Sequence, residues 1–137
     1  MKLRQVDVLI VEDQQFDVEL ILRALYVHAP DLTAAVATTA AAAIEYLQTH
    51  SPKAILLDLH LPDADGCELL KKIREDGRYG GIPIIVLTGS GTDRHRNEAN
   101  RLGVTGYVNK TPDVQTLAER LILFKYLLQK KLTPTRP

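Results

Sequence analysis

The carboxylates of this chain that suit chemical work stand directly after apolar runs. Asp58 closes the run 54–57, and Glu12 and Asp13 close the run 8–11. A buried carboxylate loses solvation unless a cation lies beside it. If the two runs form neighbouring strands, three carboxylates meet at one edge of a sheet, and that charge needs a cation. The pattern therefore predicts a chemical site rather than a group that stabilises the fold.

A threonine and a lysine complete this pattern, because Thr88 and Lys110 follow two further apolar runs. Mg²⁺ binds one or two carboxylates, keeps several waters and completes its shell with a phosphate oxygen. A carboxylate can also attack phosphorus and form an aspartyl phosphate. A cation and a hydroxyl then stabilise the phosphoryl oxygens. The residue types therefore predict phosphoryl chemistry supported by Mg²⁺.

The apolar patterning predicts five strands that alternate with five helices. Strands are expected at residues 6–11, 32–37, 53–58, 83–88 and 105–109. Helices are expected at residues 14–28, 40–49, 65–76, 93–102 and 113–130. This alternation indicates right-handed crossovers and a parallel sheet. We expect an α/β, flavodoxin-like doubly wound (βα)5 fold with a five-stranded parallel sheet in the order 2-1-3-4-5. Its ligands bind beyond the carboxyl ends of the strands.

Length and composition narrow the class of protein. The 137 residues fit one domain, expected at residues 1–131 and followed by a flexible tail at 132–137. The 17 basic and 17 acidic residues cancel, so no overall field favours nucleic acid or a membrane surface. The single cysteine, Cys67, excludes an internal disulfide and is expected to be a small buried residue. No apolar run reaches membrane-spanning length, and we expect a cytoplasmic protein.

Five motifs in order resemble the receiver domain of two-component response regulators, in its chemotaxis-like, stand-alone form. These motifs are Glu12-Asp13, the segment 58–66, Thr88, Tyr107 and Lys110. Each motif is weak alone, but their order along residues 5–125 is specific. The resemblance implies a phosphoacceptor signalling domain rather than an enzyme, one that catalyses only its own phosphotransfer and dephosphorylation.

The resemblance also assigns roles to individual residues. Asp58 would accept a phosphoryl group from a sensor histidine kinase or a phosphotransfer protein, with Lys110 and Thr88 contacting that group. Thr88 and Tyr107 would form the switch pair, in which the hydroxyl moves toward the phosphate and the ring follows.

The same resemblance implies a Mg²⁺ site. Asp13 and Asp58 would bind the ion, Glu12 would act mainly through water, and the backbone carbonyl of His60 would complete the site. Glu12 stands where many relatives carry aspartate, and glutamate still reaches a metal-bound water.

One departure from the family concerns the peptide bond after Lys110. The family usually has a cis proline there, whereas Thr111 follows Lys110 and Pro112 comes one residue later. A cis bond before threonine costs about 3 kcal/mol. The geometry of this bond is therefore left open by the sequence.

Taken singly, these residues have simpler interpretations. Asp13 alone would more often cap a helix, and Asp65 is expected to cap the helix that follows it. Thr39 is expected to do the same for the helix 40–49. A lone histidine such as His60 is weak evidence for a metal ligand. Only the combined pattern favours a phosphoryl site.

Two helices indicate a surface for signalling. The helix 93–102 has few apolar residues to anchor it, so it is the element most easily shifted. Within the run 121–128 only Lys125 is polar. The apolar surface of this helix would therefore be wider than the one stripe that faces the core. We therefore expect the fourth helix, fifth strand and fifth helix to bind a downstream protein or a second copy of the chain. Six residues follow Lys131, and the sequence offers no recognition helix for DNA. We therefore expect a stand-alone regulator without direct nucleic-acid binding. The alternative is a receiver excised from a longer regulator or hybrid kinase.

Three other functions fit the sequence less well. A phosphatase of the haloacid dehalogenase type needs an acid two residues after the nucleophile, where His60 stands. A flavodoxin-type flavin or nucleotide binder needs a first loop that accepts phosphate, and the acidic residues of 12–15 would repel one. A receiver that no longer accepts phosphate is disfavoured by the complete set of acids and lysine.

Overall fold

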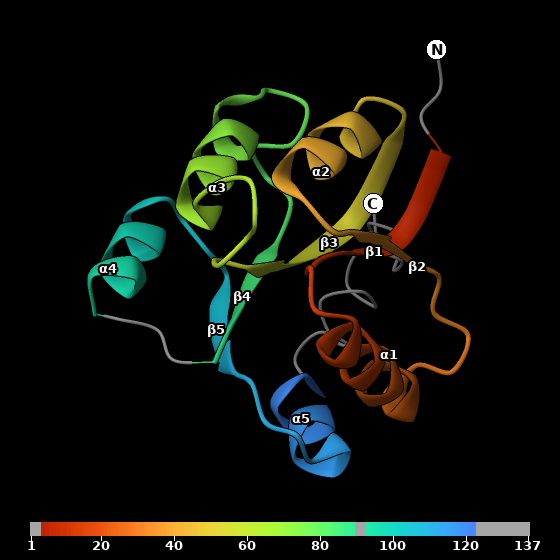
Figure 1. Ribbon diagram of the computed structural model, residues 1–137. Helices are drawn as coiled ribbons and strands as arrows, with labels where there is room; N and C mark the ends of the chain where they lie inside the picture. The colour runs from red at the N-terminus through yellow and green to blue at the C-terminus, as the bar shows by residue number, and fades with distance from the viewer. Residues whose placement is uncertain (1–3, 90–92, 123–137) are drawn as a thin grey trace, which may run out of the picture.

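A five-stranded parallel sheet forms the centre of the computed structural model, which describes residues 4–89 and 93–122 (Figure 1). Its strand order is β2-β1-β3-β4-β5, as predicted. The strands are β1 (Arg4–Val11), β2 (Ala34–Ala37), β3 (His50–Asp58), β4 (Ile84–Thr88) and β5 (Gly106–Asn109). The helices are α1 (Gln15–His28), α2 (Ala40–Leu47), α3 (Gly66–Glu75), α4 (Asp93–Arg101) and α5 (Val114–Arg120).

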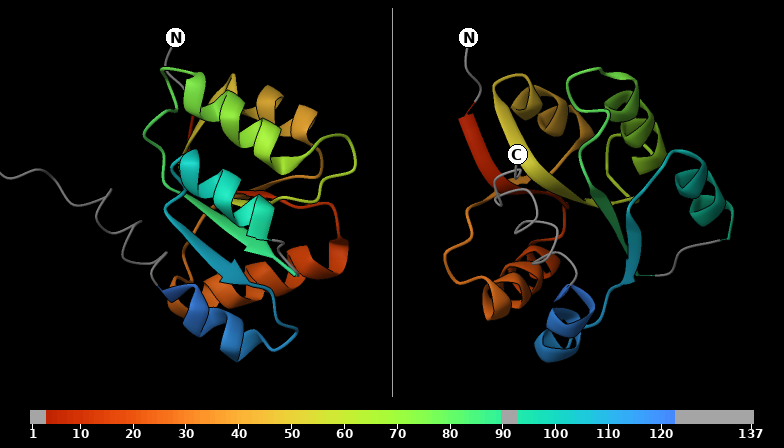
Figure 2. Two further views of the ribbon diagram at one scale, coloured as in Figure 1. Left: turned by 90° about the vertical axis from the view of Figure 1, so that its left-hand side faces the viewer. Right: turned by 180° about the vertical axis from the view of Figure 1, so that it is seen from behind.

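The helices cover the sheet on both faces. α2, α3 and α4 lie on one face, and α1 and α5 lie on the other (Figures 1 and 2). Along β3 the side chains alternate between the two cores: Leu56 packs toward α1 and α5, and Leu57 packs toward α2 and α3. β4 and the second half of β3 are buried on both faces, and their sequences are accordingly almost continuously apolar, whereas the edge strands β2 and β5 are partly exposed. The doubly wound fold predicted from the sequence is confirmed.

The strand register brings the carboxyl ends of the strands to one edge. Val11 of β1 lies opposite Leu57 of β3, and Asp58 lies opposite Leu87 of β4. Residues that follow these ends therefore emerge close together. This is the edge at which doubly wound sheets bind ligands.

Two strands begin earlier than predicted. β3 starts at His50 rather than at residue 53, and β1 starts at Arg4 rather than at residue 6. The extra residues pair with each other, with Arg4 opposite His50 and Val6 opposite Pro52. β4 joins β3 only from Ile55 onward. Pro52 is therefore tolerated because only one neighbouring strand pairs with this part of β3.

Both predicted helix caps are present. Thr39 Oγ1 accepts a hydrogen bond from the Ala42 amide at 3.0 Å, and Asp65 Oδ1 accepts one from the Cys67 amide at 2.8 Å. Cys67 itself is buried, as expected. The helix predicted up to residue 130 extends beyond the described residues, and the predicted tail at 132–137 and most of the apolar run 121–128 lie outside them.

Arg74 of α3 connects three segments at the other edge of the sheet. Its guanidinium donates to four backbone carbonyls, those of Gly80 at 2.9 Å, Ile82 at 2.7 Å, Leu102 at 3.2 Å and Gly103 at 2.8 Å. Gly103 has a φ of 77°, which favours glycine. These bonds fix the segments that lead into β4 and β5, and through them the strand ends that reach the site.

In the part of the chain that the structure describes, no helix is long and apolar enough to span a membrane.

Candidate functional site

Three carboxylates gather at the carboxyl edge of the sheet. Glu12 and Asp13 follow β1, and Asp58 ends β3. One oxygen of each lies within 4.8 Å of the others. Glu12 and Asp58 are almost completely buried, whereas Asp13 is half-buried. The side chains that the sequence predicted to converge therefore lie together.

The ammonium group of Lys110 lies among these acids. Its Nζ is 2.5 Å from Glu12 Oε1 and 3.3 Å from Asp58 Oδ2. The backbone amide of Lys110 donates to the Thr88 carbonyl at 2.9 Å, which fixes the residue beside β4. No cis peptide bond occurs in the described segments, so the bond between Lys110 and Thr111 is trans. The lysine therefore reaches the site without the cis bond usual in the family.

Asp17 also contacts this lysine, a residue that the sequence analysis did not single out. Its Oδ2 accepts a hydrogen bond from Lys110 Nζ at 3.1 Å. Asp17 lies in the first turn of α1, directly after the acidic pair. Its place in the first turn of the helix that follows the acidic pair was a usable signal, because the start of that helix lies at the same edge of the sheet.

Burial perturbs the electrostatics of the cluster. Burial and the nearby Asp58 carboxylate together raise the pKa of Glu12 to about 7, against the opposing effect of Lys110. Burial alone would lower the pKa of Lys110, but its contacts with Glu12, Asp58 and Asp17 outweigh burial and raise it. The cluster therefore holds a permanently charged lysine and an excess of acidic groups, which an additional cation would relieve.

The loop after Asp58 is held in one conformation. The His60 amide donates to Asp58 Oδ1 at 3.0 Å, and the Gly66 amide donates to the Leu59 carbonyl at 2.8 Å. A Cβ atom on Gly66 would lie 2.4 Å from Leu59 Cα, so only glycine permits this approach. The Asp63 carboxylate accepts hydrogen bonds from the first two amides of α2, at 2.8 and 3.0 Å.

The His60 side chain is exposed and packs edge-to-face on His95 of α4, with ring centroids 5.4 Å apart. Among the described residues, the group of side chains placed to hold a metal ion consists of Glu12, Asp13 and Asp58, and the His60 ring is not part of it. Carboxylate oxygens are the donors that Mg²⁺ prefers. The donor set therefore fits a hard divalent cation.

Thr88 and Tyr107 occupy different surroundings. The Thr88 side chain is fully buried, and its Oγ1 has no hydrogen-bond partner among the described residues. Tyr107 is half-buried, and its hydroxyl donates to the His95 carbonyl at 3.1 Å. The Arg96 guanidinium lies 5.1 Å from the centre of the Tyr107 ring. Thr88 thus carries a free donor at the end of β4, and Tyr107 connects β5 to α4.

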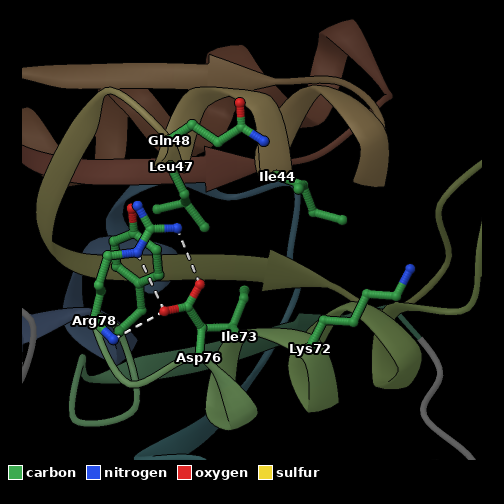
Figure 3. A pocket seen from close by; sticks show the side chains of 8 residues that line it. Ile44, Leu47, Gln48, Lys72, Ile73, Asp76 and Arg78 are labelled. Atoms are coloured by element: carbon green, nitrogen blue, oxygen red, sulfur yellow. Dashed lines mark hydrogen bonds and ion pairs between the residues drawn. The ribbon is translucent and has the colours of Figure 1, made fainter.

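A cavity lies between α2 and α3, away from the acidic cluster. Its volume is about 200 Å³, and Ile44, Leu47 and Ile73 form apolar walls (Figure 3). Its one carboxylate, Asp76, is held by Arg78 at 3.1 Å, as the dashed lines show. This lining offers no free acid for metal binding or nucleophilic attack. We therefore place the functional site at the acidic cluster.

The fold and the cluster together define a class of protein: a doubly wound domain with an acidic site for a cation beyond its parallel strands. The chain belongs to the family of response regulator receiver domains, whose family model matches residues 8–122. Members of this family are signalling domains rather than conventional enzymes. They bind Mg²⁺ or Mn²⁺ at an acidic pocket.

Individual relatives agree with this assignment. Response regulator Rre1 of Synechocystis is 30% identical over 112 residues, which cover 82% of this chain and 48% of that protein. The Mn²⁺-bound form of response regulator Rcp1 matches with a TM-score of 0.73 and 29% identity over 96% of this chain and 99% of that one. The phosphorylated cyanobacterial phytochrome response regulator RcpA matches with a TM-score of 0.76 and 26% identity, over 98% of each chain. The chain spans about half the length of the curated relatives it matches.

Proposed function

We propose that Asp58 accepts a phosphoryl group from a sensor histidine kinase or a phosphotransfer protein, in a reaction that depends on Mg²⁺. The observation that carries this proposal is the buried Asp58 carboxylate, with Lys110 Nζ 3.3 Å from Oδ2 and two further acids beside it. A buried nucleophile surrounded by a fixed cation and a metal-binding set suits phosphoryl transfer. We place this activity in the cytoplasm, in keeping with the single, unpaired Cys67.

In the transfer, an Asp58 carboxylate oxygen forms a bond to the phosphorus of a donor phosphohistidine. The P–N bond breaks, and its electron pair stays on the imidazole nitrogen, which then takes up a proton. Lys110 is placed to balance charge on one side of the phosphoryl group, and the unpartnered Thr88 hydroxyl is a donor for another oxygen. Glu12, Asp13 and Asp58, with the His60 carbonyl, would hold Mg²⁺, which supplies positive charge to the phosphoryl oxygens when bound.

The signal would leave through α4, β5 and α5. When the Thr88 hydroxyl turns to the phosphate, space opens beside it that the Tyr107 ring can take. Movement of Tyr107 alters its bond to the His95 carbonyl and hence the position of α4. Ala99 is buried on α4, and the few apolar anchors of this helix ease its displacement. A downstream protein or a second copy of the chain would bind this surface.

The test uses acetyl phosphate, Mg²⁺ and intact-mass measurement. We expect a labile adduct of one phosphoryl group on the natural chain and none on Asp58→Asn. The matched control is Asp31→Asn, because Asp31 is exposed and far along the chain from the site. A chain that gains no adduct would be a receiver without phosphoacceptor activity. Steady hydrolysis of a general phosphomonoester would favour the phosphatase, and a bound yellow chromophore would favour the flavin binder.

A further inference from the structure

Lys110 is shared among three carboxylates, and the third comes from a different element. Glu12 and Asp58 belong to the sheet edge, whereas Asp17 belongs to the first turn of α1. The contact between Asp17 Oδ2 and Lys110 Nζ, at 3.1 Å, spans 93 residues of sequence. It joins the start of α1 to the segment after β5.

We propose that Asp17 is a positioning residue that competes with the phosphoryl group for Lys110, so that phosphorylation releases the start of α1. This inference rests on the proposed function and adds a regulatory step to it. In the unphosphorylated protein, the Lys110 ammonium group donates one of its hydrogen bonds to Asp17 of α1. After transfer, Lys110 turns to the phosphoryl oxygens and the contact with Asp17 breaks.

The exposed fractions and the charges of the three carboxylates explain why Lys110 would give up its contact with Asp17 first. The Asp17 side chain is 29% exposed, against 6% for Asp58 and 1% for Glu12. Water can replace the lysine at Asp17, but it cannot reach the buried Glu12. The phosphoryl group carries about −1.5 to −2 charges and replaces the single negative charge of the Asp58 carboxylate, so the negative charge next to the ammonium increases. The added charge therefore outweighs the single, partly solvated carboxylate of Asp17.

Among the helices whose N-caps are described, α1 is the one without a side-chain cap, so we expect the contact with Lys110 to matter at its start. Its N-cap residue, Gln14, makes no capping hydrogen bond with its side chain, whereas Thr39, Asp65 and Asp113 cap α2, α3 and α5. Phe16, next to Asp17, is a large apolar side chain that is 65% exposed beside the phosphoacceptor edge. Release of Asp17 therefore changes the conformation of an exposed aromatic at the rim of the site, where the phosphodonor must approach.

Fluorine NMR gives a direct test, because the sequence contains only two phenylalanines, Phe16 and Phe124. The chain is labelled with fluorophenylalanine, and Phe16→Leu assigns the two signals. We expect the Phe16 signal of the natural chain to move when acetyl phosphate and Mg²⁺ are added. In Asp17→Asn the signal should already lie near the phosphorylated position and move little. An unchanged Phe16 signal in a fully phosphorylated natural chain would overturn the proposal.

Kinetics separate competition for Lys110 from a merely structural role. Asp17→Asn should speed phosphorylation by acetyl phosphate by about threefold, the range expected for loss of one partly exposed ion pair. Asp17→Glu should restore the natural rate, and the control Asp31→Asn should leave it unchanged. In a Lys110→Met background, Asp17→Asn should have no effect. A threefold effect that persists without Lys110 would mean general repulsion of the donor, and the proposal would be wrong.

The failure of this inference is distinguishable from failure of the proposed function. Intact mass first establishes whether the natural chain gains a phosphoryl group. If no adduct forms on Asp58, the proposed function is wrong, and the role of Asp17 falls with it. If the adduct forms and Asp17→Asn behaves as the natural chain does in both assays, only the role of Asp17 is wrong.

Discussion

Replacing Glu12 by glutamine should stabilise the metal-free protein at pH 8 but not at pH 4.5. Glu12 is buried, and burial with the repulsion of Asp58 raises its pKa from 4.5 to about 7. The folded state therefore binds more protons than the unfolded state between these values. Stability falls as the pH rises through this window, because the folded protein must ionise a carboxyl group that resists ionisation.

The size of the effect follows from the shift. About 2.5 pKa units correspond to about 3 kcal/mol at 1.36 kcal/mol per unit. The natural chain carries this cost in full above pH 7 and carries none below pH 4.5. Glutamine has no ionisable proton, so the variant avoids the change. The stability of Glu12→Gln relative to the natural chain should thus rise by up to about 3 kcal/mol from pH 4.5 to pH 8.

Urea unfolding at a series of pH values, in buffer with a metal chelator, measures this difference. Subtracting the natural chain from the variant at each pH removes the contributions of other titrating groups. Glu45→Gln is the matched control, because Glu45 is exposed on α2 and should give a difference that does not vary with pH. A Glu12→Gln difference that stays constant from pH 4.5 to 8 would refute the reasoning. Excess Mg²⁺ at pH 8 should stabilise the natural chain more than the variant, because the ion binds the ionised acids.

Three further outcomes are expected. Arg74→Gln should lower the free energy of unfolding by about 3 kcal/mol in a urea titration, because four backbone carbonyls lose a charged donor. Cys67 should resist iodoacetamide at pH 8 in the folded protein and react on unfolding, since burial raises its pKa to about 11. Phe16→Ala should slow phosphorylation by a histidine kinase but not by acetyl phosphate, because this exposed ring offers apolar contact only to a protein donor.

Each of these outcomes has its own control. Arg101→Gln removes an exposed guanidinium paired with Glu98, and a loss equal to that of Arg74→Gln would contradict the role given to the backbone hydrogen bonds of Arg74. Rapid alkylation of the folded chain would show that the thiol is accessible. Equal slowing by Phe16→Ala with both donors would indicate damage to the site itself rather than lost contact with a protein.

The sequence predicted most of the site because apolar strands end at fixed places. Once the runs before Glu12 and Asp58 are identified as neighbouring parallel strands, their carboxylates must meet at one edge. The confirmed sheet order and family follow from the same pattern. The features that the sequence pattern did not predict depend on which strands pair and on where side chains point. The early start of β3 requires β1 as a partner, and Asp17 matters only because α1 turns it toward a lysine 93 residues away.

Prediction was weaker where one residue departs from the family. The bond after Lys110 is trans, and Thr111 gives no local pattern that decides this. The backbone bond from the Lys110 amide to the Thr88 carbonyl fixes the lysine instead, and such a bond is visible only once β4 and β5 are paired. The roles of Thr88 and Tyr107 remain predictions that phosphorylation must test.

The two hydrogen bonds that Asp63 accepts from the start of α2 would give the domain a preferred direction of response to phosphorylation. One side of the loop that carries the phosphoacceptor is anchored to a capped helix, and a push in that direction meets two charge-assisted bonds. The opposite side faces α4, and Cys67, Asp65 and Tyr107 contact His95 of this helix. If Asp58 is phosphorylated as proposed, we therefore expect α4 to be displaced more readily than α2. An Asp63 substitution would remove the anchor on the α2 side and reduce the motion of α4 without changing any residue of the acidic cluster.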